Sequence, residues 1–180
     1  PWAEIEQRIW GLNVITGETW KIRSQEGEDV AVGHEYWFAD GERIGYHGRP
    51  RSGRSHHVFG HIKWDNSDHV EANFPFHSTH FHSLDESIIV GDGTPAFVFT
   101  SDSKARPFIQ LFKWDGEQYV GPRILSFHRS TFNNQHAHCH PRFTPDGKSV
   151  LYTSDLTSYS QMYLVNIGDF DDLPMLEEAT

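Results

Sequence analysis

Apolar and polar residues alternate over short runs along this chain, which is the pattern of β-strands with one buried face. The runs are rich in aromatic and β-branched residues, which suit a pleated backbone. Strands are therefore predicted over residues 8–14, 87–90, 96–100, 108–112 and 162–165. Dipeptides typical of tight turns lie at 16–17, 40–41, 115–116 and 146–147. The pattern contains no long helical period, and only a short turn of helix is expected near residues 171–178.

Three segments share one pattern, which indicates a repeated architecture. In residues 34–46 and 140–152 a histidine lies six residues before the aspartate of an Asp-Gly turn, and an apolar residue lies four after that aspartate. Residues 80–90 form a looser third copy around Asp85. The turn aspartates at 40, 85 and 146 lie 45 and 61 residues apart, close to the roughly 40–50 residues of a four-stranded propeller blade. Each copy is predicted to form a strand, a hairpin turn and a second strand.

The predicted fold class is all-β, a β-propeller. In a propeller the inner strands of successive blades line one channel, so a histidine at the same place in each repeat would point toward a common axis. At about 45 residues a blade, 180 residues make about four blades. An open ring would leave sheet edges exposed. We therefore expect residues 1–180 to form a single propeller domain that is the C-terminal part of a larger propeller, with N-terminal blades missing.

Charge and composition narrow the classes of partner. The formal net charge of −10 argues against nucleic-acid binding, which needs a basic surface. No apolar run approaches the roughly 18 residues of a membrane span, and the single Cys139 rules out an internal disulfide framework. An anionic ligand is still compatible with this charge, because a metal ion and a few arginines can make one cleft locally positive.

Histidines are unusually frequent, at 13 in the chain, and the cluster at the C-terminal side is the best candidate site. His138 and His140 would leave the same face of one strand if the backbone were extended there. Gln135 lies close enough for its amide oxygen to join them, and such a mixed N/O set suits a divalent first-row metal. Cys139 would point the opposite way. On composition alone, ordinary surface and core histidines are the more frequent explanation.

Five motifs follow one another along the chain: Arg8-Ile-Trp; Gly33-His-Glu-Tyr-Trp with Asp40-Gly41; His80-x-x-Ser with Val90-Gly-Asp-Gly93; Gln135-x-x-His-x-His-Pro with Phe143-Thr-Pro-Asp-Gly-Lys148; and Tyr163-Leu-Val-Asn-Ile-Gly-Asp-Phe-Asp-Asp-Leu-Pro174. In this order they resemble the oligogalacturonate lyases. The resemblance implies a seven-bladed propeller about twice as long as this chain. It also implies a bacterial, usually cytoplasmic enzyme that cleaves short pectin fragments by β-elimination and carries a manganese ion.

The resemblance also implies roles for single residues. The metal ligands would be His80, Gln135, His138 and His140, and the general base would be His34, with Arg8 near the reacting sugar. His82 competes with His80 for the place of the third imidazole. Independently of the resemblance, His128 and Arg129 are candidates for substrate contacts, because they lie just before the metal segment. The basic run 49–57 is interpreted as a solvated loop.

β-Elimination of a uronate gives each of these residue types a task. A base removes the C5 proton beside a carboxylate, and a divalent metal on that carboxylate offsets the developing charge. Three imidazoles and an amide leave the ion cationic, which suits an anionic substrate. Histidine has an ordinary pKa of roughly 6.5, so His34 would be largely unprotonated near pH 7. Arg8 could hold a carboxylate through two hydrogen bonds.

Three alternatives stay open at this point. The first is a metal-dependent hydrolase on the same scaffold, in which bound water attacks an ester or phosphate. The second is a non-catalytic propeller module that binds a protein or sugar and holds its metal only structurally, in a closed shell. The third is a chain that is inactive without its N-terminal blades. Metal identity, substrate length and oligomeric state are not predicted.

Overall fold

The computed structural model describes residues 9–23, 30–50, 57–74, 78–93 and 107–175, with no account of the side chains of residues 49 and 50. Within these ranges every regular element is a β-strand, apart from two single turns of 3-10 helix. No helix in the described part of the chain has the length and apolar character to cross a membrane. The strand expected at 96–100 lies outside the described residues, as does Arg8.

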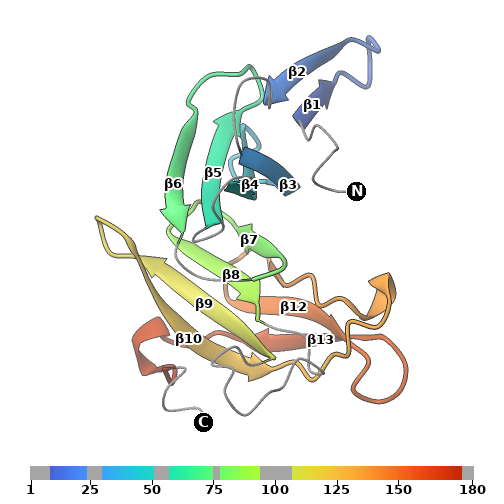
Figure 1. Ribbon diagram of the computed structural model, residues 1–180, viewed down its shortest axis with the longest axis vertical. Coiled ribbons are helices and arrows are strands. Elements are labelled where there is room, and N and C mark those ends of the chain that lie inside the picture. Colours follow the sequence, from blue (N-terminus) through green and yellow to red (C-terminus); the bar gives the residue numbers. More distant parts are fainter. Residues whose placement is uncertain (1–8, 24–29, 51–56, 75–77, 94–106, 176–180) are drawn as a thin grey trace. The chain divides into compact units, whose positions relative to one another are not determined.

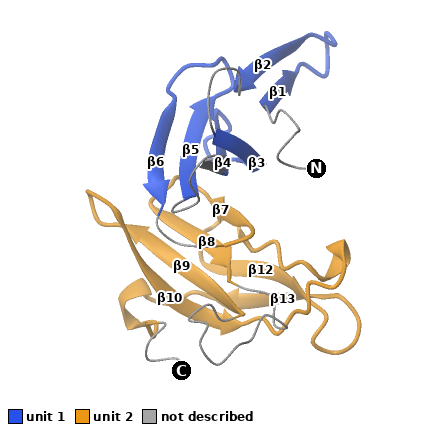
Figure 2. Cartoon of the chain, in the orientation of Figure 1, with its two compact units in different colours: residues 1–77 blue, residues 78–180 orange. Residues whose placement is uncertain are grey.

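The chain divides into two compact units, residues 1–77 and residues 78–180, which Figure 2 shows in different colours. Each unit has its own sheets and core, and each is described by itself. The single domain expected over residues 1–180 stays a prediction.

Unit 1 contains a two-stranded and a four-stranded antiparallel sheet. Strands β1 (Ile9–Leu12) and β2 (Thr19–Arg23) form the first. Strands β3 (Val30–Trp37), β4 (Arg43–Pro50), β5 (His57–Lys63) and β6 (Val70–Phe74) form the second, in sequence order (Figure 1). Apolar side chains from both sheets share one buried cluster: Ile9, Ile22, Val32, Ile44, Tyr46 and Ile62. Strand β3 buries Val32 and Tyr36 between less buried residues, as the alternation in the sequence indicated, whereas β4 is buried on both faces over residues 44–48 and β5 over residues 58–62.

Unit 2 contains a four-stranded and a three-stranded antiparallel sheet. Strands β7 (Phe81–Ser83), β8 (Ile88–Asp92), β9 (Phe108–Trp114) and β10 (Tyr119–Phe127) form the first. The 3-10 turn η3 (Gln135–Ala137) precedes the second, which consists of β11 (Arg142–Phe143), β12 (Ser149–Ser154) and β13 (Gln161–Asn166). The 3-10 turn η4 (Phe170–Asp172) follows, near the short helical turn expected from the sequence. The buried cluster between these elements includes Val90, Leu111, Cys139 and Val150.

The three-copy repeat is present in the structure as three hairpins, β3–β4, β7–β8 and β11–β12. In each turn the aspartate side chain accepts a hydrogen bond from the backbone N–H two residues further on, at 2.8 Å for Asp40, 3.0 Å for Asp85 and 3.1 Å for Asp146. The residue after each aspartate has a φ of +69°, which Gly41 and Gly147 adopt without strain and Glu86 adopts in their place. The predicted strand, turn and strand of each copy are therefore confirmed.

Candidate metal centre

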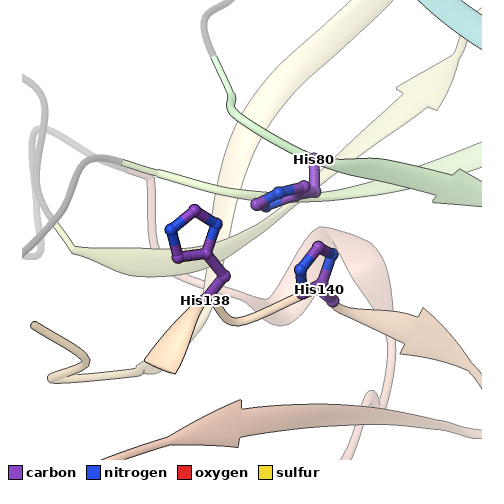
Figure 3. A group of neighbouring side chains, drawn as sticks. All are labelled: His80, His138 and His140. Atoms are coloured by element: carbon purple, nitrogen blue, oxygen red, sulfur yellow. The ribbon is translucent and has the colours of Figure 1, made fainter. Parts of the chain in front are cut away.

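Three imidazoles converge in unit 2. His80, His138 and His140 each offer one ring nitrogen, and these three atoms all lie within 4.8 Å of one another (Figure 3). His80 comes from the segment before β7, whereas His138 and His140 come from the segment between η3 and β11. The centroid of the His80 ring lies 3.9 Å from that of His140 and 5.4 Å from that of His138. The prediction that the repeat makes distant histidines neighbours is confirmed for His80 and His140.

A buried carboxylate fixes the orientation of His80. Asp92, at the end of β8, is 0% exposed, and its Oδ2 lies 2.5 Å from His80 Nδ1. Its Oδ1 accepts hydrogen bonds from the backbone N–H groups of Thr79 at 3.0 Å and His80 at 2.7 Å. A carboxylate beside Nδ1 accepts the proton of that nitrogen, which is the arrangement in which Nε2 can serve as the ligand atom. This carboxylate–histidine arrangement is the one that commonly orients metal-binding histidines.

The segment from Gln135 to His140 is not a strand, and the extended backbone considered for His138 and His140 is present only at His138. Residues 135–137 form η3, because the side chain of Asn134 accepts hydrogen bonds from the backbone N–H groups of His136 and Ala137. His138 then adopts an extended conformation, with φ of −72° and ψ of 139°, and His140 has a φ of +44°. The two rings nevertheless lie near each other, with centroids 5.8 Å apart.

Cys139 lies between the two ligand candidates and takes no part in the cluster. Its side chain is fully buried in the apolar core of unit 2. Burial raises the pKa of its thiol, so the thiolate that a metal would need is disfavoured. The prediction that Cys139 points away from the two histidines is confirmed, although the backbone that achieves it is not extended throughout.

His138 is in the state that a metal ligand requires. Its Nδ1 is buried and has no hydrogen-bond partner among the residues that the structure describes. Burial, and then the proximity of His80, lower the pKa of His138, so its ring is neutral. A neutral ring with an unused buried nitrogen fits an ion at this place, since metal binding requires the unprotonated imidazole.

Gln135 lies beside the three imidazoles. Its amide nitrogen is 3.0 Å from His140 Nε2, and the side chain is otherwise exposed. A half-turn of the amide would present its oxygen to the same space. The structure therefore brings all four ligand candidates together, three imidazoles and one amide.

His82, the competitor of His80, lies outside this group. Its Nδ1 accepts a hydrogen bond from the backbone N–H of Phe143 at 3.2 Å. Burial, and to a lesser extent the charge of Arg142, lower the pKa of His82 to about 4. Of His80 and His82, only His80 lies in the cluster with His138 and His140. Sequence reasoning overlooked Asp92, which decides this, although it closes the strand that follows the turn at Asp85.

The two candidate substrate contacts differ in exposure. His128 is fully buried, and its Nδ1 accepts a hydrogen bond from the backbone N–H of Ser130 at 2.9 Å. Its ring lies 5.5 Å from that of Phe132, which in turn lies 4.9 Å from the ring of His138. Arg129 is exposed, with its guanidinium 5.2 Å from the ring of Phe127. Contacts of His128 and Arg129 with a substrate stay predictions.

The candidate base, His34, belongs to unit 1. It is exposed on β3, and its Nδ1 lies 3.1 Å from Nε2 of the buried His47 on β4. The roles of His34 and Arg8 in catalysis stay predictions.

Comparison with known proteins identifies the family. A sequence profile of the oligogalacturonate lyases matches residues 1–170. The chain belongs to the oligogalacturonate lyase family. An oligogalacturonide lyase of Pectobacterium atrosepticum is 27% identical to it over 173 residues, which are 92% of this chain and 44% of that protein.

Solved structures agree on the fold. An oligogalacturonate lyase in complex with manganese superposes with a TM-score of 0.69 at 23% identity, over 94% of this chain and 43% of that one. An oligogalacturonate lyase from Vibrio parahaemolyticus gives 0.71 at 24% identity, over 94% and 44%. The all-β propeller class predicted from the sequence is therefore confirmed. The chain spans less than half the length of the relatives that it matches.

Proposed function

We propose that this chain supplies the metal centre and the base of a lyase that cleaves short oligogalacturonates by β-elimination. The observation that carries the proposal is the convergence of His80, His138 and His140, with Gln135 beside them. Membership of the oligogalacturonate lyase family supports it, and so does a solved member that was crystallised with manganese.

We propose Mn²⁺ as the ion, with His80, His138, His140 and the amide oxygen of Gln135 as its ligands. Once bound, it would withdraw negative charge from the substrate carboxylate next to C5. All four ligands are neutral, and within the described residues the cluster contains no carboxylate. Such a set offsets less of the charge of the ion than carboxylate ligands would, which suits an anionic uronate better than it suits a neutral substrate.

The proton transfer is assigned to His34. Its Nε2 would take the proton from C5, the electron pair of that C–H bond would form the C4–C5 double bond, and the C4–O bond would break. The departing oxygen takes up a proton, and the new non-reducing end is a 4,5-unsaturated uronate. Arg8 would pair with a substrate carboxylate, and Arg129, which is exposed, would contact the substrate. The side chain of His128 is fully buried, so its predicted substrate contact would require that side chain to become exposed.

The test uses the complete protein that carries this chain, with digalacturonate and Mn²⁺. Growth of near-ultraviolet absorbance from the unsaturated product is expected, and His34→Ala should abolish it. His136→Ala is the matched control for the metal centre, because His136 is exposed beside the ligands and lies outside the cluster. Saturated products would show a hydrolase, and substrate binding without turnover would show a binding module. Either result would overturn the proposal.

A further inference from the structure

We infer that His47 is a positioning residue for His34: it accepts a hydrogen bond from His34 Nδ1 and so leaves His34 Nε2 unprotonated, ready to take a proton. The inference rests on the proposed role of His34 as the base. It concerns which nitrogen of that base is available, which the family comparison does not address.

The two rings are held together closely. His34 Nδ1 and His47 Nε2 are 3.1 Å apart, and the rings stack with centroids 4.8 Å apart and planes 19° from parallel. A hydrogen bond between two ring nitrogens requires a proton on one and a lone pair on the other. The tautomer of His47 therefore determines the tautomer of His34. Since His47 is only 7% exposed and His34 is exposed, the buried ring is the fixed partner.

The backbone around His34 is shaped to present this side chain. Gly33 pairs with His47, and Tyr36 pairs with Gly45, so β3 has one residue more than β4 between these pairs. This is a β-bulge, a feature that re-aims a side chain on one strand. His34 has a φ of +56°, an unfavourable conformation for a residue that is not glycine. The sheet thus maintains a costly local geometry where the candidate base leaves it.

The internal repeat gives an independent reason for the assignment. His47 lies seven residues after the turn aspartate Asp40, and Asp92 lies seven residues after the turn aspartate Asp85. Asp92 is the residue that holds Nδ1 of His80. In both hairpins a buried side chain on the second strand thus binds Nδ1 of the histidine on the incoming segment. The position that fixes the tautomer of the metal ligand in one copy fixes that of the candidate base in the other.

The chemistry of the substrate explains why the partner of His34 is an imidazole. A carboxylate beside the base would add negative charge where a uronate, itself an anion, has to approach. A neutral imidazole accepts the same hydrogen bond and adds no charge. Beside a metal ligand a carboxylate carries no such penalty, because the cation offsets it. The two partners therefore suit the charges that each histidine would meet.

The first test reads the tautomer directly, by nitrogen-15 NMR of the histidine rings in the chain. In the parent we expect the proton of His34 on Nδ1 and none on Nε2. His47→Phe keeps the ring and its approximate volume but has no acceptor, so His34 should change toward the tautomer mixture of an unpaired histidine. His47→Gln offers an amide oxygen near the place of the ring Nε2 and should retain the parent tautomer.

Two results would overturn the inference. One is an NMR spectrum of the parent in which His34 carries its proton on Nε2. This measurement needs no variant, so it tests the inference even if His47→Phe does not fold. The other is an unchanged His34 in a folded His47→Phe. His69→Phe is the control: His69 lies in the same unit and hydrogen-bonds to Tyr46 and Glu71, so its loss should leave the His34 signals unchanged.

The second test separates this inference from the proposed function. In the complete protein, His47→Phe should lower kcat by about 100-fold with little change in KM, since a misplaced catalytic group costs rate rather than affinity. His47→Gln should recover most of it. A parent without lyase activity would refute the proposed function and leave the tautomer result standing. If the parent is active and the kcat of the His47→Phe variant equals that of the parent, the positioning role of His47 alone would be refuted.

Discussion

The hairpins β3–β4 and β7–β8 are built to the same plan and hold their histidines in different surroundings. Each has a turn aspartate followed by a residue with φ of +69°, and each binds a histidine through Nδ1. In β7–β8 the histidine is buried and its partner is a carboxylate, Asp92. In β3–β4 the histidine is exposed on a bulge, and its partner is an imidazole, His47.

This difference shows how little would have to change for one hairpin to serve the two proposed roles, base and metal ligand. The buried ring of His80 lies beside the rings of His138 and His140, where an ion could bind. The ring of His34 is exposed instead, as a base that takes a proton from a substrate would have to be. Burial and the charge of the partner, rather than the backbone plan, distinguish the two.

The largest expected effect is the loss of the exposed histidine. His34→Ala should lower kcat by about 10²–10⁴-fold, the usual contribution of a general base. The affinity of the His34→Ala variant for Mn²⁺, measured by isothermal titration calorimetry, should stay at the parent value. A parallel loss of metal affinity would mean that the two hairpins do not serve separate tasks. His69→Ala provides the control for removing an imidazole from unit 1.

Adding the ion should stabilise one unit and not the other, because His80, Gln135, His138 and His140 all belong to residues 78–180. At a Mn²⁺ concentration 100 times Kd, the free energy of unfolding of this unit should rise by about 2.7 kcal/mol. Amides that exchange only when the unit unfolds should then exchange about 100-fold more slowly. Hydrogen exchange followed by mass spectrometry should show this for β8 and β12. Equal slowing in β3 and β4 would contradict separate opening of the two units.

Changing the carboxylate of the buried pair should weaken metal binding by about 10–100-fold. In Asp92→Asn an amide N–H can face His80 Nδ1, which would shift the ring proton to Nε2 and remove the lone pair that the ion needs. Calorimetry with Mn²⁺ gives the affinity, and His136→Ala should bind as the parent does. An unchanged affinity in a folded Asp92→Asn would show that the carboxylate does not set the tautomer of His80.

The smallest expected effect concerns the turn of the β3–β4 hairpin. Burial acts to raise the pKa of Asp40, but hydrogen bonds from Arg43 and from the backbone of Glu42 outweigh it and lower that pKa to about 2. A carboxyl whose pKa is lowered by folding stabilises above its ordinary pKa, and this contribution is lost as the pH falls toward 2. Because the pair with Arg43 is largely exposed, it is worth less than about 1 kcal/mol.

Asp40→Asn keeps an oxygen for the turn and removes the titration, so it tests this contribution. Acid unfolding of unit 1 should depend less on pH between about 4 and 2 in the variant than in the parent. Circular dichroism at a series of pH values measures it. An unchanged acid profile would show that Asp40 contributes nothing that depends on its charge.

Most of the strands and hairpins could be predicted from the sequence, because they depend on local patterns. Alternation of apolar residues indicated the strands, and the Asp-Gly turns indicated the hairpins. The repeat predicted that His80 and His140 would be neighbours. The condition of one extended strand through His138 and His140 was not met, because His138 is extended but His140 has a φ of +44°. The turn of 3-10 helix before them, which the side chain of Asn134 caps, was also not expected, because local strand propensity does not register such a cap.

The choice between His80 and His82 could not be made from the sequence, because both precede the same turn and both are buried. It depends on Asp92, a partner twelve residues away from His80 that only the pairing of β7 with β8 brings near. The tautomer partner of His34 was missed for the same reason. Strand pairing, rather than composition, determines which neutral or charged group a histidine meets.

The burial of Cys139 has a consequence for ion selectivity. Its side chain packs in the core, and its carbonyl oxygen accepts a hydrogen bond from the backbone N–H of Thr153 at 2.9 Å. His138 and His140 flank it, so the packing of Cys139 holds the backbone of both residues before any ion binds. If these two histidines are ligands, an ion then has only their side-chain torsions to adjust. A cation whose radius fits this backbone spacing would therefore be favoured over one that matches only in its intrinsic affinity for imidazole.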